Sequence, residues 1–145
     1  MNYHQFRYSV AVILMLAVSV ALGCERATKL VIKGRNPPVF VMSGSGSLGI
    51  IRVRGPENQR EAEGEDAFLY WVIVNREDED QNVERLGPVT YGKVPQGYKQ
   101  VYPERGEAPQ LVEGERYNIR IATNNANGVD KFFVIRNGKV EVADY

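Results

Sequence analysis

The chain has 145 residues, and its 18 Lys and Arg side chains balance its 18 Asp and Glu side chains, so that the formal net charge is zero. Such a balance gives no electrostatic footprint for nucleic acid, and we expect no nucleic-acid partner. The chain has one cysteine, Cys24, and one histidine, His4. A disulfide within the chain is therefore excluded, and histidine and cysteine, on which Ser–His and Cys–His pairs and most zinc sites depend, are almost absent.

Residues 1–23 have the pattern of a bacterial signal segment. A short head containing Arg7 precedes an apolar run over residues 10–22, which contains no acidic residue. The run is 13 residues long, whereas a helix needs about 20 apolar residues to cross a bilayer. We therefore predict a signal peptide that is cleaved, with an uncleaved transmembrane helix as the alternative.

The four residues Ala21-Leu22-Gly23-Cys24 resemble the lipobox of bacterial lipoproteins, although Ala21 stands where that family most often has leucine. The resemblance implies that the Cys24 thiol receives a diacylglyceryl group and that Cys24 becomes the N-terminus, with two or three fatty acyl chains such as palmitate. Two or more chains hold a protein stably on a membrane. The expected location is the bacterial cell envelope, outside the cytoplasm, and the acidic Glu25 leaves inner or outer membrane open.

Removal of the signal divides the chain into a lipidated N-terminus with a short tether, residues 24–29, and a single domain, residues 30–145. His4 would leave with the signal and Cys24 would carry lipid. Ser–His and Cys–His pairs would then be unavailable, as would zinc sites built on histidine or cysteine. We predict that the protein is not an enzyme and binds no cofactor.

The domain predicts short strands separated by turn residues, and no helical periodicity of comparable strength. Residues 67–74 are apolar at every position, which is typical of a central strand covered on both faces. Tyr117, Ile119 and Ile121 alternate with polar residues and are expected to point inward. Further strands are predicted at residues 30–32, 39–42, 50–54, 89–94, 98–102, 131–135 and 140–142.

These strands predict an all-β domain, an antiparallel sandwich of seven to nine strands, with a small barrel as the alternative. Asn127-Gly128 and Asn137-Gly138 predict hairpin turns, because both residue types tolerate positive φ. Pro103 and Pro109 predict an irregular edge connection between residues 98 and 113.

The pattern Leu111-x-x-Gly114-x-x-Tyr117 resembles the tyrosine corner of fibronectin type III and immunoglobulin-like sandwiches. The resemblance covers residues 68–140, and residues 30–55 do not align well with seven standard strands. It implies that the tyrosine hydroxyl bonds to the backbone a few residues upstream. It also implies that Trp71 is the core tryptophan of the domain.

Gly44, Gly46 and Gly49 match the glycine spacing of a dinucleotide-binding loop. That loop requires a helix after it, and the apolar and basic residues 50–54 predict a strand instead. We therefore predict no nucleotide binding and interpret the segment as a hairpin loop.

Asp78, Asp80 and Asn82 alternate as the first ligands of a calcium loop do. Val83 stands at the sixth position, where such loops have glycine, and Val89 at the twelfth, where they have glutamate. A solvated loop is the better prediction, with a calcium site as the weaker alternative.

Two functions remain open. The first is an interaction module that contacts another envelope protein through its loops or an edge strand. The second is a glycan- or peptidoglycan-binding domain, for which Tyr70, Tyr91, Tyr98 and Tyr102 would be the stacking rings. These tyrosines lie within apolar strands, so core packing is the preferred interpretation of them.

Overall fold

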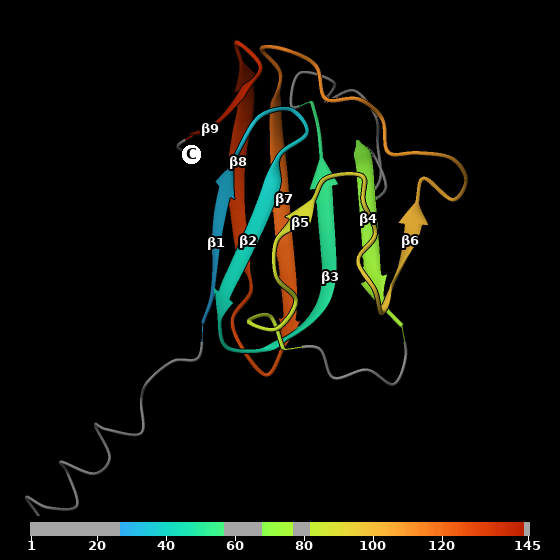
Figure 1. The fold of residues 1–145 in the computed structure, drawn as a ribbon, viewed down its shortest axis with the longest axis vertical. Coiled ribbons are helices and arrows are strands. Elements are labelled where there is room, and N and C mark those ends of the chain that lie inside the picture. The colour runs from blue at the N-terminus through green and yellow to red at the C-terminus, as the bar shows by residue number, and fades with distance from the viewer. Residues whose placement is uncertain (1–26, 57–67, 77–81, 144–145) are drawn as a thin grey trace, which may run out of the picture.

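A computed structural model describes residues 27–56, 68–76 and 82–143. This part of the chain is all-β and contains nine strands and no helix, so none of it forms a helix that could cross a membrane (Figure 1). The strands are β1 (Thr28–Lys33), β2 (Val39–Gly44), β3 (Ser47–Arg54), β4 (Leu69–Asn75), β5 (Val89–Thr90), β6 (Tyr98–Tyr102), β7 (Arg116–Asn124), β8 (Val129–Arg136) and β9 (Lys139–Ala143).

The strands form two antiparallel sheets that pack face to face like a sandwich (Figure 1). The smaller sheet has the order β1-β2-β5, and the larger has the order β6-β4-β3-β7-β8-β9. Every pairing between named strands is antiparallel. The predicted all-β fold with two antiparallel sheets is therefore confirmed.

The strongest sequence patterns become interior strands of the larger sheet. In β4, Trp71 and Ile73 are fully buried on one face, and Val72 is 5% exposed on the other. In β7, Tyr117, Ile119 and Ile121 are buried, whereas the residues between them are half-buried or exposed. Both predictions of strand orientation are confirmed.

The predicted strand at residues 89–94 is too long, because β5 ends at Thr90. Gly92 has a φ of 78°, and the Lys93 N–H donates to the Thr90 carbonyl over 3.0 Å. A turn therefore replaces the second half of the expected strand.

The prediction of a hairpin at Gly44 to Gly49 is wrong, because β2 and β3 lie in different sheets. The segment carries the chain from one sheet to the other and leaves little room for side chains. Gly46 has a φ of 106°, and a Cβ there would lie 2.8 Å from the Cβ of Ala126. Glycine is thus needed for close packing at this crossing.

One of the two predicted Asn-Gly turns is confirmed. Asn137 and Gly138 join β8 to β9 with φ values of 52° and 67°. Between β7 and β8 the positive φ falls at Asn125 instead, at 61°. Asn127 instead binds the start of β1, because its carbonyl accepts the Thr28 N–H over 2.9 Å.

Aromatic side chains form the centre of the core and join the two sheets. Phe40 of β2 contacts Phe133 of β8 with ring centroids 6.2 Å apart, and Phe133 stacks on Tyr117 at 5.6 Å. Trp71 is fully buried, and its indole N–H donates to Gln100 Oε1 over 3.1 Å. The predicted role of Trp71 as a core residue is confirmed.

The bond that the tyrosine-corner motif predicts is present. The Val112 N–H donates to the Tyr117 hydroxyl oxygen over 2.8 Å, and the Tyr117 ring is fully buried. Gly114 has a φ of 81°, and its N–H donates to the Ile135 carbonyl over 2.8 Å. The connection that enters β7 is therefore fixed by two hydrogen bonds, one to the Tyr117 side chain and one from the Gly114 backbone.

We predict that Tyr117→Phe lowers the free energy of unfolding by about 1–3 kcal/mol, because it leaves the Val112 N–H without its acceptor. Tyr102→Phe is the matched control, because Tyr102 is 38% exposed. We expect it to change stability by less than about 0.5 kcal/mol. Urea unfolding of both variants measures the difference, and equal losses would contradict a role for the corner bond.

Candidate functional site

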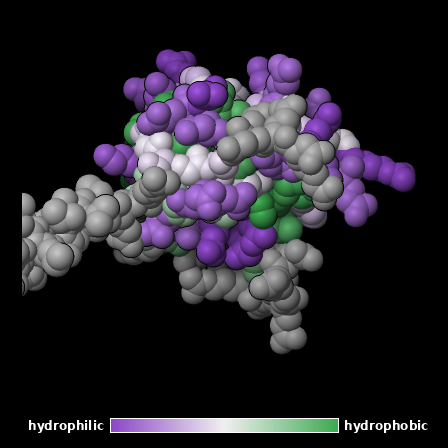
Figure 2. All heavy atoms as spheres, turned by 90° about the horizontal axis from the view of Figure 1, so that it is seen from below, coloured by the Kyte–Doolittle hydropathy of each residue, from purple (hydrophilic) through white to green (hydrophobic). Residues whose placement is uncertain are grey.

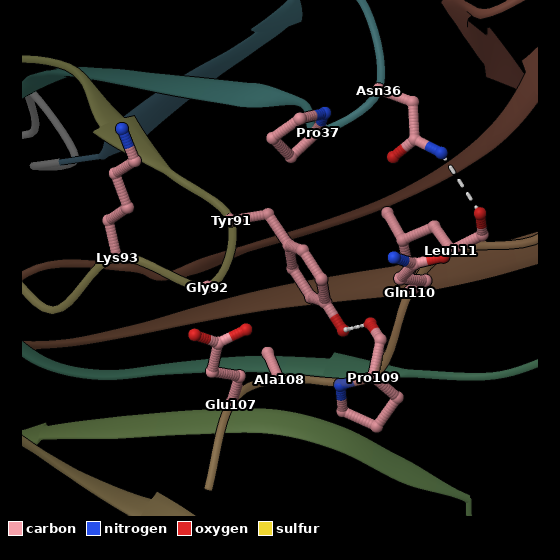
Figure 3. A pocket seen from close by; sticks show the side chains of 10 residues that line it. All are labelled: Asn36, Pro37, Tyr91, Gly92, Lys93, Glu107, Ala108, Pro109, Gln110 and Leu111. Atoms are coloured by element: carbon pink, nitrogen blue, oxygen red, sulfur yellow. Dashed lines mark hydrogen bonds between the residues drawn. The ribbon is translucent and has the colours of Figure 1, made fainter.

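Three connections between strands enclose a cleft of about 520 Å³ (Figure 3). They are the connection from β1 to β2, the turn after β5 and the connection from β6 to β7. This volume lies within the range of small-ligand sites, about 300–1,000 Å³. The lining residues are Asn36, Pro37, Tyr91, Gly92, Lys93, Glu107, Ala108, Pro109, Gln110 and Leu111.

Tyr91 forms a rigid wall of the cleft. Its ring packs edge-on against Trp71 with centroids 5.5 Å apart, and its hydroxyl donates to the Pro109 carbonyl over 2.8 Å. Its backbone N–H donates to the Pro38 carbonyl over 2.9 Å. Tyr91 therefore ties the turn after β5 to the other two connections.

Asn36 makes a second tie across the cleft. Its side-chain amide donates to the Leu111 carbonyl over 2.9 Å, and its backbone N–H donates to the Gly138 carbonyl over 3.1 Å. The first of these bonds links the β1–β2 connection to the residues that precede β7 (Figure 3). The shape of the cleft is thus held by hydrogen bonds between its own walls.

The cleft combines apolar and charged surface. Pro37, Pro109 and the Tyr91 ring supply apolar surface, whereas Lys93 and Glu107 are exposed and carry opposite charges. Among the ten described lining residues there is no serine, threonine, cysteine or histidine. This arrangement can hold an extended polypeptide segment or a small polar molecule.

The residues predicted for lipid and calcium fall mainly outside the described chain. Cys24, Asp78 and Asp80 are among the residues whose structure is not described. Asn82 is described, and its Oδ1 accepts the Glu84 N–H over 2.9 Å within a turn. In the described part of the chain, no three acidic, histidine or cysteine side chains gather where a metal ion could bind.

The four tyrosines proposed for glycan stacking do not gather on one exposed face. Tyr98 is 2% exposed, and its hydroxyl donates to the Leu48 carbonyl over 3.2 Å. Tyr70 packs edge-on against Tyr117 with centroids 5.3 Å apart, and Tyr91 lies against Trp71. Only Tyr102 of the four is exposed, so core packing is the better interpretation of the other three.

Sequence reasoning missed the cleft, although it noted two of its features. Pro109 was expected in an irregular connection, and Tyr91 was considered as a stacking ring. Asn36, Tyr91 and Ala108 are far apart in the chain, and no local pattern shows that they meet. All three connections contain proline and glycine. This composition is the one feature of the sequence that predicts turns there.

Comparisons with protein-family models, with curated proteins and with solved structures gave no match. No relative therefore assigns a role to the cleft. Its function has to be argued from its own residues and from their position in the fold.

Burial raises the pKa of two core tyrosines. The pKa of Tyr117 rises to about 12, mainly through burial, and is partly offset by its bond to the Val112 N–H. The pKa of Tyr91 rises further, through burial and then through the nearby Tyr117 and Tyr70. In the unfolded chain both phenols would titrate near pH 10. Between about pH 10 and 12 the unfolded state therefore binds fewer protons than the folded state, and stability falls as pH rises.

We predict that the free energy of unfolding falls between about pH 10 and 12, as the linkage requires. Tyr117→Phe removes one of the two shifted groups, so this variant should lose less stability over the same interval. Urea unfolding at a series of alkaline pH values measures both slopes. Identical slopes in the parent and in Tyr117→Phe would show that this phenol is not responsible.

Proposed function

We propose that this chain is a lipid-anchored, non-catalytic interaction module of a bacterial cell envelope, built as an immunoglobulin-like or fibronectin type III-like sandwich. The observation that carries the proposal is the spacing between anchor and fold. β1 begins at Thr28, four residues after Cys24, and the Thr28 N–H is already bonded to the Asn127 carbonyl. Four residues span at most about 14 Å. A lipid on Cys24 would thus hold the sandwich against the membrane surface.

The strand order supports the immunoglobulin-like type. A constant-type immunoglobulin sandwich has strands A, B, E and D in one sheet and C, F and G in the other, and this chain has no described counterpart of D. In sequence order, β1, β2 and β5 match the first set, and β3, β7 and β8 match the second. The corner at Tyr117 opens β7, where such a domain has its tyrosine corner. The larger sheet extends beyond the matched strands by β4 and β6 on one side and by β9 on the other.

The cleft is the surface that supports binding of a partner protein best. Its walls are held by their own hydrogen bonds, so a partner would meet a largely preformed site. Apolar surface bordered by charged side chains is also common in protein interfaces. Ala108 lies half-buried in its lining and is small, so the space in front of it is open to a partner side chain.

We predict that Cys24→Ser releases the protein from the membrane fraction, because the lipid attachment atom is gone. Fractionation after a high-salt wash measures this, with Ser43→Ala of the described domain as a control that keeps the anchor. A Cys24→Ser protein that stays entirely in the washed membrane fraction would overturn the anchoring part of the proposal.

We predict that Ala108→Arg abolishes crosslinking of the anchored protein to its envelope partner, because a long charged side chain fills the cleft. Val142→Arg adds the same side chain at a residue that is 53% exposed and outside the cleft. This control should crosslink as the parent does. Crosslinking that survives Ala108→Arg, in a protein shown by circular dichroism to be folded, would place the partner elsewhere.

A further inference from the structure

The outer side of the smaller sheet carries an exposed apolar residue at the centre of β1. Every second residue of β1 is buried, and Val31, which lies between two buried residues, is 56% exposed. The register places Val31 beside Val41 of β2, which is half-buried. Figure 1 looks onto this side of the sheet, and no described segment crosses β1 there. The fold therefore leaves apolar surface uncovered on its first strand.

Two lysines flank Val31 on the same side of β1. Lys29 and Lys33 are exposed, and neither forms an ion pair with another described residue. The three strands of the smaller sheet, β1, β2 and β5, contain no aspartate or glutamate. Val39 of β2 lies beside Lys33 and is half-buried. We call this surface the valine–lysine face, which consists of Lys29, Val31, Lys33, Val39 and Val41.

Valines and lysines in one sheet face suit the boundary between a membrane and water. Apolar side chains can enter the region between headgroups and acyl chains. Lysine stems cover apolar surface while their ammonium groups reach the phosphates of anionic lipids. Only Val31 among the three valines is more than half exposed, so the face would bind a membrane weakly if the protein were free in solution. A weak surface becomes occupied when a short tether raises its effective concentration at the target.

The proposed anchor would hold this face near the membrane. Lys29 follows Cys24 by five residues, which span at most about 18 Å. Figure 2 views the end of the sandwich at which β1 begins. In the left half of that view, the side on which β1 lies in Figure 1, the described residues are mainly hydrophilic, and the hydrophobic area lies in the right half. Beside the tether, the apolar surface is therefore that of the sheet face and not that of the end.

We propose that the valine–lysine face rests on the membrane, with Val31 in the interface and with Lys29 and Lys33 on the phosphate groups of anionic lipids. The inference rests on the proposed function in one respect, namely that Cys24 anchors the chain. It adds an orientation, because the smaller sheet would then face the lipid and the larger sheet would face away from it.

The test uses the full chain, purified from bacterial membranes and reconstituted in vesicles of phosphatidylglycerol and phosphatidylcholine. Val31→Trp places a fluorescent ring in the valine–lysine face. Phosphatidylcholine with bromine atoms on its acyl chains quenches a tryptophan that enters the interface. We expect brominated lipid to lower the emission added by Val31→Trp about twofold or more.

Val112→Trp is the matched control for position. Val112 is 51% exposed and lies outside the face, so brominated lipid should leave the emission of this variant unchanged. Trp71 is fully buried and contributes the same background to every variant. Circular dichroism checks that each variant is folded.

Charge variants in the Val31→Trp background test the two lysines. Lys29→Gln with Lys33→Gln should lower the ratio of docked to undocked protein about fivefold for each lysine at low salt. Lys99→Gln with Lys139→Gln removes the same charge from exposed positions of the larger sheet, and should leave the quenching as it was. High salt, or vesicles without phosphatidylglycerol, should reduce the quenching as the loss of Lys29 and Lys33 does.

Val31→Trp emission that brominated lipid does not quench, in protein that floats with the vesicles, would overturn the inference and leave the anchor standing. An equal loss of quenching in the two lysine pairs would also overturn it. A blue shift that grows with protein density, without quenching by lipid, would assign the face to a second copy of the chain instead. Protein that does not float with the vesicles would overturn the anchoring part of the proposed function, and this inference with it.

Discussion

The fully buried ring of Tyr117 links the aromatic core to the connection that leads into β7. It stacks on Phe133, which contacts Phe40 of the opposite sheet, and its hydroxyl accepts the Val112 N–H. The chain has one cysteine, so no disulfide within it can hold the sheets together. Packing of aromatic side chains has to supply that link, and burial of such rings contributes more per residue than any other group. The corner bond then orients the connection that leads into β7.

The shape of the cleft depends on the same bond between the Val112 N–H and the Tyr117 hydroxyl. Tyr117 fixes Val112, and the adjacent Leu111 is buried and receives the Asn36 amide on its carbonyl. Two residues earlier, the Pro109 carbonyl accepts the Tyr91 hydroxyl. The floor and two walls of the cleft are thus continuations of the core rather than free loops. Loops positioned by a rigid scaffold are a common place for binding sites, which is why we propose this cleft as the partner's binding site.

Charge is distributed unevenly over the fold. The cleft has one charge of each sign at its rim, Lys93 and Glu107, and suits a segment without strong net charge. On the outer side of β3 and β7, the positions between the buried residues include four arginines, Arg52, Arg54, Arg116 and Arg120. The formal net charge of the whole chain is zero and does not show this difference between the two regions. Alternation in β3 and β7 then sorts the cations onto one side, because the other side faces the core.

The sequence by itself determined the class of the fold and several of its parts. Alternation and aromatic content marked β4 and β7, Asn137-Gly138 marked a turn, and the Leu-x-x-Gly-x-x-Tyr pattern marked the corner bond. These features depend on local φ preferences and on a period of two, which nearby residues dictate. Only the tertiary structure decided that β2 and β3 belong to different sheets, that Asn125 rather than Gly128 takes the positive φ, and that Asn36 meets Leu111. Such pairings join residues far apart in sequence, and the burial shared by both sheets selects them, so no short segment carries the information.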